Sequence, residues 1–222
     1  MHTSEERSEH GEWQAFVSEL HHRLNNNLQM ITSVIALQES RSTNPQVAAA
    51  IRATHNRVRA IAGILGPNST PDLATVHFGD YLASMIHELV AEYSVSDRVK
   101  TEIRTTDMAV DVDQAIPLAL IANELVANTL EHAFPDDVRG TMCVALSYTG
   151  EIAHACEPAD QYGVLEVADD GIPLPATFDL QTAESTGFYL VRNLTWQLRA
   201  TITVAEHTPG GKTFRLTFPI DH

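Results

Sequence analysis

The chain of 222 residues has few cysteines and few basic residues, and each shortage excludes a class of site. Cys143 and Cys156 are the only cysteines and neither belongs to a CxxC pair, so a disulfide framework or a thiolate zinc site is not indicated. The eleven histidines are scattered, and only His21 and His22 are adjacent. Consecutive helical residues point in different directions, so this pair does not indicate a metal site either.

The balance of charge and apolar residues excludes further partners. Fourteen basic against twenty-nine acidic residues give a net charge of −15. Nucleic acids and anionic membranes bind basic surfaces, so neither is an expected partner. No apolar run approaches the roughly 18 residues of a membrane span, and the polar start MHTSEERSEH is unlike a signal peptide. We therefore expect no membrane insertion and a cytoplasmic protein.

Residues 1–70 predict a helical hairpin. Apolar residues recur in steps of three and four along residues 13–38 and again along 47–65, with turn formers and Pro45 between the two stretches. In the first stretch they are Phe16, Val17, Leu20, Leu24, Leu28, Ile31, Val34 and Ile35. A single hairpin has too little core to be stable, so we expect a homodimer in which two hairpins form a four-helix bundle.

Residues 71–222 predict a second domain of mixed structure, with a hinge around residues 66–72. Periodicity indicates helices at 80–93, 113–133 and 187–198, and strands at 99–104, 142–148, 164–168, 201–205 and 212–219. Residues 208–211 form a predicted turn, and a polar connection contains Glu157 and Pro158. This mixed order favours an α+β sandwich, a sheet with helices on one face.

The first predicted helix carries an unusually polar segment, residues 21–29. Three successive asparagines are poor helix formers, and such a local conflict is typical of a functional site. A neutral imidazole at His22 can act as a nucleophile towards a phosphoryl group. Asn26, four residues later, lies on the same helix face and can orient a water or the phosphoryl group. A solvated helix face is the alternative interpretation.

The helix predicted at 113–133 carries a second polar group. Glu124, Asn128 and His132 are spaced four apart and share one face, with Asn123 beside them. An asparagine oxygen is a suitable ligand for Mg²⁺, which prefers oxygen and usually keeps several waters. A plain amphipathic helix that shows its polar side to solvent would have the same pattern.

Two further segments suit a nucleotide. Asp169 follows a predicted strand, where its carboxylate can accept a hydrogen bond from an adenine amino group, and Gly171 permits close approach of a ligand. Ser185 and Thr186 precede Gly187 at the start of a predicted helix, where free backbone N–H groups favour phosphate. Taken singly, these segments are also an ordinary turn and an ordinary helix cap.

Taken together, these segments resemble a known family. Residues 19–29, ELHHRLNNNLQ, resemble the phosphoacceptor box of the HisKA_2 sensor histidine kinases, which are related to the HWE kinases. The order Asn-Glu-x-x-x-Asn, Asp-x-Gly, Ser-Thr-Gly and GGKTFRLTFP resembles the Bergerat-type ATP site of histidine kinases, gyrase-type ATPases, Hsp90 and MutL. The resemblance implies that His22 is the phosphoacceptor, Asn128 a Mg²⁺ ligand and Asp169 the adenine-binding residue, with Gly171 and Gly187 shaping the pocket.

The function implied is that of an ATP-dependent protein-histidine kinase. It would autophosphorylate His22 and pass the phosphoryl group to an aspartate of a response regulator receiver domain, with a separate sensor protein as a possible source of input. The chain departs from the family at Asn25 and Glu131, where lysine is usual, and at Pro173, where a second glycine is usual. The segment 174–186 should include the nucleotide lid.

Three alternatives stay open. The first is a histidine phosphotransferase or response-regulator phosphatase with a degenerate ATP site. This role would suit the departures from the family pattern and the position of Asn26. A gyrase- or MutL-type ATPase would use Glu124 as a general base, but it gives the His22 box no role. A non-catalytic dimerisation scaffold is the simplest of the three.

Overall fold

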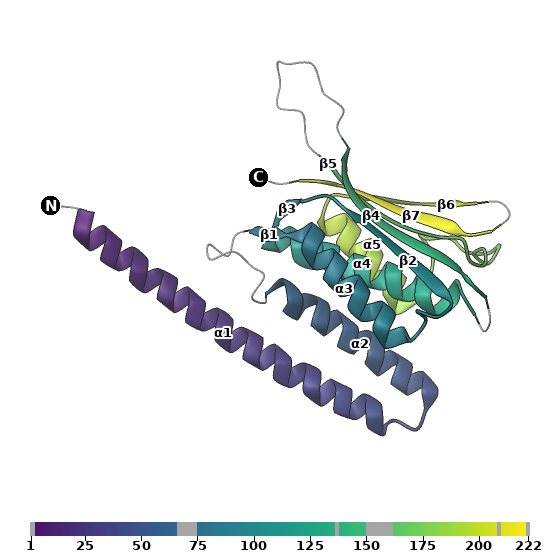
Figure 1. The fold of residues 1–222 in the computed structure, drawn as a ribbon, viewed down its shortest axis with the longest axis horizontal. Helices are drawn as coiled ribbons and strands as arrows, with labels where there is room; N and C mark the ends of the chain where they lie inside the picture. Colours follow the sequence, from purple (N-terminus) through teal and green to yellow (C-terminus); the bar gives the residue numbers. More distant parts are fainter. Residues whose placement is uncertain (1–2, 66–74, 136–137, 150–161, 208–209, 221–222) are drawn as a thin grey trace, which may run out of the picture. The chain divides into compact units, whose positions relative to one another are not determined.

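The structure is a computed structural model, and its chain divides into two compact units, Met1–Val76 and His77–His222. Figure 1 shows the elements of both units. The residues described are 3–65, 75–135, 138–149, 162–207 and 210–220. The predicted hinge at 66–72, residues 208–209 of the predicted turn 208–211, and the connection around Glu157 lie outside them.

The first unit contains the predicted hairpin of two helices, α1 (Thr3–Arg41) and α2 (Pro45–Ile64). Asn44 ends the connection because its side chain accepts hydrogen bonds from the backbone N–H groups of Gln46 and Val47, at 2.9 and 3.4 Å, and Pro45 fits the first helical position. The two helices are linked by an ion pair of 2.8 Å between Arg52 and Glu39. The helix α1 begins about ten residues earlier than its apolar periodicity indicates.

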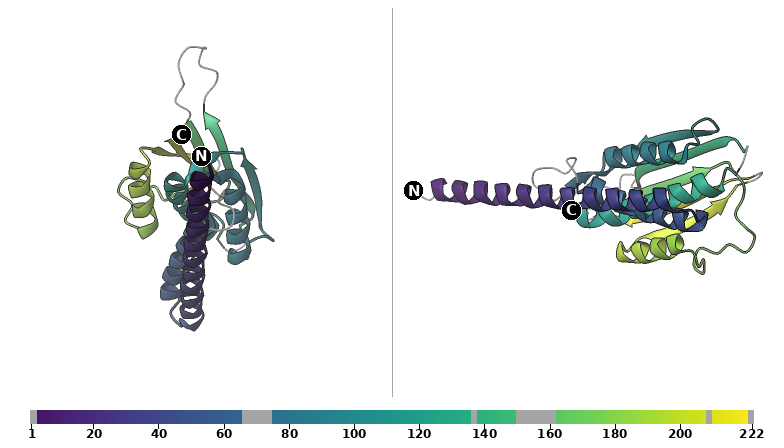
Figure 2. Two further views of the ribbon diagram at one scale, coloured as in Figure 1. Left: turned by 90° about the vertical axis from the view of Figure 1, so that its left-hand side faces the viewer. Right: turned by 90° about the horizontal axis from the view of Figure 1, so that it is seen from below.

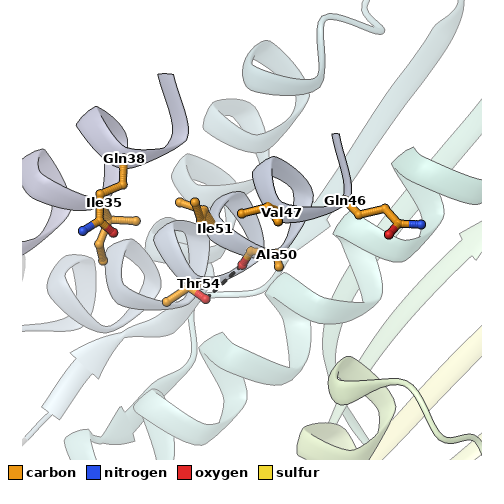
Figure 3. A pocket seen from close by; sticks show the side chains of 7 residues that line it. All are labelled: Ile35, Gln38, Gln46, Val47, Ala50, Ile51 and Thr54. Carbon is orange, nitrogen blue, oxygen red and sulfur yellow. Dashed lines mark hydrogen bonds between the residues drawn. The ribbon is translucent and has the colours of Figure 1, made fainter. Parts of the chain in front are cut away.

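Large apolar side chains remain exposed on this hairpin. The exposed fractions are 44% for Ile31, 51% for Val34 and 48% for Val47. Between the helices lies an open groove of about 430 Å³ (Figure 3). Its lining is mainly apolar and consists of Ile35, Gln38, Gln46, Val47, Ala50, Ile51 and Thr54.

The second unit is built on a five-stranded sheet in the order β2-β4-β5-β7-β6. The strands β2 and β4 are parallel, and all other neighbours are antiparallel. The bounds are β2 Val99–Thr105, β4 Gly140–Thr149, β5 Tyr162–Asp169, β6 Thr201–Glu206 and β7 Lys212–Pro219. Two further strands of three residues each, β1 (Thr75–His77) and β3 (Ala109–Asp111), were not expected from the sequence.

Three helices lie on one face of this sheet, as Figures 1 and 2 show: α3 (Phe78–Tyr93), α4 (Val112–His132) and α5 (Thr186–Gln197). The predicted α+β sandwich is therefore confirmed. Among the described residues no helix is long and apolar enough to cross a membrane.

The buried face of β5 and β7 is apolar along most of its length and polar at one end. On β7 the alternate residues Phe214, Leu216 and Phe218 are buried, and they pair in register with β5 residues on the same face. One step further along this face is Lys212, which is paired with Asp169 and is equally buried. The face that begins as an apolar core therefore ends, where β5 ends, in two buried charges.

Candidate functional site

Asn123, Glu124 and the amide nitrogen of Asn128, all on α4, lie inside the domain. Asn123 and Glu124 are 2% and 6% exposed, and Asn123 Nδ2 donates a hydrogen bond of 3.3 Å to Glu124 Oε1. The Nδ2 atom of Asn128 is enclosed and has no hydrogen-bond partner among the described residues. A buried polar atom without a partner costs about 1–3 kcal/mol. For these residues the interpretation as a solvated helix face is therefore wrong.

The start of α5 lies against this group. Ser185 caps the helix, since its hydroxyl accepts a hydrogen bond of 3.3 Å from the backbone N–H of Phe188. A Cβ atom placed on Gly187 would lie 2.5 Å from Glu124 Oε2 and 3.8 Å from Asn128 Nδ2. Only glycine fits here without displacing Glu124. The structure thus brings Glu124, Asn128 and Gly187 together.

Asp169 ends β5, and its side chain is fully buried. Its Oδ1 atom accepts hydrogen bonds from the backbone N–H of Gly171 at 3.1 Å and from Lys212 Nζ at 3.2 Å. Its Oδ2 atom lies 3.0 Å from the same ammonium group but accepts no hydrogen bond from any described residue. The carboxylate expected to bind adenine is therefore already paired with a lysine.

The turn after Asp169 is fixed to the end of α4. The backbone N–H of Ile172 donates a hydrogen bond of 2.9 Å to the carbonyl oxygen of Ala133. That same oxygen occupies the space that a side chain at Gly171 would need. Glycine at 171 is thus required by its close approach to the backbone of α4, which orients Asp169 relative to the polar residues of that helix.

The polar segment around His22, residues 21–29, is regular helix. His22 belongs to α1, and Asn26, one turn later, is exposed. An exposed ion pair of 2.7 Å joins Glu19 to Arg23 on either side of His22 in the sequence. The helix therefore continues through the asparagines in spite of their low helix propensity.

Comparison with known proteins identifies both parts of the chain. Residues 19–93 match the family HisKA_2, described as histidine kinase, and residues 113–222 match HATPase_c, described as histidine kinase-, DNA gyrase B-, and HSP90-like ATPase. The chain belongs to the HisKA_2 histidine kinases. The motifs from which the resemblance was predicted lie within these two matched regions.

Named relatives are longer proteins. The sensor histidine kinase PdtaS of Mycobacterium tuberculosis (strain ATCC 25618 / H37Rv) is 30% identical over 81% of this chain, which spans 34% of that protein. Blue-light-activated histidine kinase 2 of Erythrobacter litoralis (strain HTCC2594) is 26% identical over 88% of this chain, which spans 54% of that protein. The chain thus spans between about a third and about half of these relatives.

A solved structure supports the fold over almost the whole chain. The histidine kinase domain of the Erythrobacter litoralis EL346 blue-light activated histidine kinase superposes with a TM-score of 0.66 at 22% identity. The alignment covers 95% of this chain and 96% of the other. At this identity the similarity establishes the fold alone.

Two residues of this HisKA_2 chain are placed away from the buried group. The side chain of His132 is 71% exposed, at the end of α4, and its Nε2 atom lies 3.8 Å from Glu131 Oε2. Glu131 Oε1 accepts a hydrogen bond of 2.8 Å from the hydroxyl of Tyr93 at the end of α3. The acidic substitution at 131 therefore has a structural partner within the domain.

The segment that follows Pro173 is packed on α5 and the sheet. The ring of Phe178 meets the rings of Phe188 and Phe214 edge-on, at centroid distances of 5.1 and 6.4 Å. Arg192 Nη1 donates hydrogen bonds to the carbonyl oxygens of Leu180 and Ala183, at 3.1 and 2.8 Å. The segment 174–186, expected to include the nucleotide lid, is thus anchored at its middle.

Sequence reasoning missed Lys212 as a site residue. A signal was available, because the strand predicted at 212–219 places Lys212 on the same alternating face as Phe214 and Leu216. A lysine on a core face is rare unless it is paired, so its position indicated a buried partner. The identity of that partner depends on strand register, which the sequence does not reveal.

Proposed function

We propose that this chain carries the phosphoacceptor and ATP-binding parts of a two-component sensor histidine kinase. The γ-phosphoryl group of ATP would be transferred to His22 and then to an aspartate of a response regulator receiver domain. Two observations carry the proposal: the start of α5 at Gly187 lies against Glu124 and Asn128 of α4, and the turn that follows Asp169 is bonded to the end of the same helix at Ala133. The amide of Asn128, the carboxylate of Asp169 and the backbone of a helix start are all suited to one nucleotide.

Each group has a part of the nucleotide that it would bind. The Asp169 carboxylate would accept a hydrogen bond from the adenine amino group. The N–H groups at the start of α5 would bind phosphate, which the positive end of the helix dipole favours. Asn123 and Glu124 form the buried wall beside them.

The residues also fit a Mg²⁺ ion that accompanies the phosphates. Amide oxygen and nitrogen are nearly indistinguishable in shape, so the enclosed unpaired position of Asn128 suits an amide oxygen turned towards a cation. Asn128 would hold the ion, and the ion's contribution is to neutralise charge on the phosphates.

In the transfer step, the protein supplies the nucleophile, His22. One neutral imidazole nitrogen of His22 would form the N–P bond while the bond from the γ-phosphorus to the bridging oxygen breaks, releasing ADP. The other ring nitrogen then loses the imidazolium proton to solvent or a base. Asn26, one turn away, would steady the phosphoryl group. Because ATP is the donor, we place the reaction in the cytoplasm, with a sensor segment or separate sensor protein as the input.

A second copy of the chain is part of this proposal. The exposed apolar residues of α1 and α2 require a partner surface, and an identical hairpin supplies one of matching length and character. The resulting four-helix bundle would carry one His22 on each α1. Homodimerisation would therefore stabilise the helix that bears the phosphoacceptor.

One observation favours the alternative of a histidine phosphotransferase or response-regulator phosphatase. The carboxylate of Asp169 already accepts a hydrogen bond from Lys212. Under this alternative, that pairing replaces the contact to adenine, and the site no longer binds ATP. Asn26 beside His22 would then orient a water for dephosphorylation of the regulator. Under this alternative His22 would receive its phosphoryl group from a phosphorylated receiver domain.

Radiolabelling separates the two functions. We expect the protein incubated with γ-labelled ATP and Mg²⁺ to gain an acid-labile label, His22→Ala to gain none, and the matched control His21→Ala to retain it. Label that persists in His22→Ala would reject His22 as the acceptor. An unlabelled wild-type protein that exchanges phosphoryl groups with a phosphorylated receiver domain would establish the phosphotransferase instead.

A further inference from the structure

Lys212 is a buried cation in a strongly acidic chain. It is 5% exposed and lies on β7, directly across from Asp169 on β5. A buried ammonium group is costly unless it is paired and hydrogen-bonded. Asp169 Oδ1 and Oδ2 lie 3.2 and 3.0 Å from Nζ, so the pair is close, although only Oδ1 accepts a hydrogen bond from the ammonium group. The two charges neutralise each other inside the domain.

The position of the pair places it at the base end of the proposed nucleotide site. Asp169 is the only carboxylate on the inner face of β5 at the end of that strand, and Gly171 fixes its turn to α4. An ammonium group has three N–H donors. Among the described residues, Asp169 is the only hydrogen-bond acceptor of the Lys212 ammonium group. Donor capacity therefore remains for a ligand that reaches Asp169.

The pair offers an acceptor and a donor side by side. The outer edge of adenine offers the complementary order: the 6-amino group donates, and the adjoining ring nitrogen N1 accepts. Guanine has a carbonyl oxygen in place of that amino group and an N–H at N1, so the order is reversed in the same orientation. A carboxylate facing a carbonyl oxygen leaves both buried groups unpaired, which is a strong basis for rejection.

We propose that Lys212 is a specificity-determining residue of this site, and that it donates a hydrogen bond to N1 of adenine while Asp169 accepts one from the 6-amino group. The inference rests on the proposed nucleotide site but not on phosphorylation of His22. It also explains why a lysine is tolerated beside the base-binding carboxylate: the ligand can share the ammonium group without breaking the ion pair.

A neighbouring ion pair on the same two strands supplies the control. Arg215 and Glu166 are also paired across β7 and β5, at 2.8 Å. Their side chains are 54% and 30% exposed, and they lie on the opposite face of the sheet. Arg215→Met thus removes a cation from β7, as Lys212→Met does, without touching the proposed site.

The experiment measures equilibrium binding of three nucleotides to the full chain: ATP, 1-deaza-ATP, which lacks N1, and purine riboside triphosphate, which lacks the 6-amino group. A hydrogen bond to a charged group contributes about 1.5–3 kcal/mol, so wild-type protein should bind ATP at least about tenfold more tightly than either analogue. In Lys212→Met the preference for ATP over 1-deaza-ATP should fall to about one, while the preference over the purine analogue remains. Arg215→Met should keep both preferences.

Because each ratio is measured within one protein, a general loss of affinity in Lys212→Met does not change its meaning. If that variant fails to fold, the wild-type comparison alone decides, since equal binding of ATP and 1-deaza-ATP contradicts a contact to N1. A Lys212→Met protein that keeps the wild-type ratio contradicts it as well.

The outcomes also separate this inference from the proposed function. Either contradictory ratio would leave the kinase proposal intact, because that proposal depends on labelling of His22. An N1-dependent ratio in a protein whose His22 takes no label would support Lys212 while rejecting the kinase. A wild-type protein that binds none of the three nucleotides would overturn both.

Discussion

The helical hairpin and the five-stranded unit each hold side chains in an environment that usually disfavours them. In the hairpin these are apolar side chains exposed to water, and in the five-stranded unit they are polar groups that are buried. On α1 and α2 large apolar side chains face outward, such as Met30 at 62% and Val34 at 51% exposed. In the second unit polar groups face inward: Asn128 Nδ2 has no hydrogen-bond partner in the part of the chain that the structure describes, and Asp169 is fully buried beside Lys212.

The difference indicates what each region requires. Exposed apolar surface is removed from water by another apolar surface, and the hairpin offers one of the right length to a second copy of itself. Buried polar atoms are satisfied by a polar ligand that enters between them. The first region is therefore built to associate with protein and the second to bind a small charged molecule.

The largest expected effect comes from placing a charge on the apolar face of the hairpin. Val34→Asp should raise the dissociation constant of the dimer by at least about 100-fold, because two symmetry-related carboxylates would be buried without partners. Sedimentation velocity over a concentration series measures the constant. Thr43→Asp, which adds the same charge at an exposed position between the helices, should stay dimeric. A wild-type chain that is monomeric at every concentration would contradict the inference that the hairpin associates with a second copy.

The periodic parts of the fold could be predicted because they repeat. Apolar spacing identified both hairpin helices, the helices α3, α4 and α5 and all five strands of the main sheet, with ends displaced by a few residues at most apart from the start of α1. The strands β1 and β3 have three residues each, too few to show an alternation. The position of His22 within a helix could likewise be predicted from its sequence box.

The contacts within the site could be predicted only in part. Asn128, Asp169 and Gly187 could be found because each belongs to a local motif. The pairing of Lys212 with Asp169 joins residues 43 apart, and that of Tyr93 with Glu131 joins residues 38 apart. Both depend on strand register or helix packing, which local sequence does not specify. Lys212 consequently changes the chemistry expected at Asp169.

A smaller effect is expected when the polar interior is made apolar. Asn128→Leu removes the unpaired amide, so the free energy of unfolding without nucleotide should stay constant or rise by about 1 kcal/mol. Wild-type protein should gain about 2.7 kcal/mol from Mg²⁺–ATP at 100 times its dissociation constant, and the variant should lose that gain. Thermal unfolding with and without nucleotide tests both, with the exposed Asn193→Leu on α5 as a control that keeps the gain. A variant that is destabilised and still protected by ATP would show that Asn128 is structural.

The smallest expected effect concerns a polar pair that lies in solvent, unlike Lys212 and Asp169. His77 Nδ1 lies 3.0 Å from Asp107 Oδ1, and their side chains are 54% and 81% exposed. The hydrogen bond and charge of Asp107 raise the pKa of His77 above its usual range, with Asp80 adding a smaller contribution. Because the folded pKa is raised, the stabilisation is fully present below the unfolded value of about 6.5 and is lost as pH rises through the folded value.

An NMR titration of the His77 ring in wild type and Asp107→Asn tests this pair. The variant should have the lower pKa, and its difference in stability from wild type should be present at acid pH and vanish above the folded pKa of His77. High salt should reduce the shift, since an exposed pair is screened by mobile ions. Equal pKa values of His77 in the two proteins would show that the contact with Asp107 does not stabilise the protonated imidazole in water. Exposed polar pairs of this domain would then differ from its buried ones in kind as well as in strength.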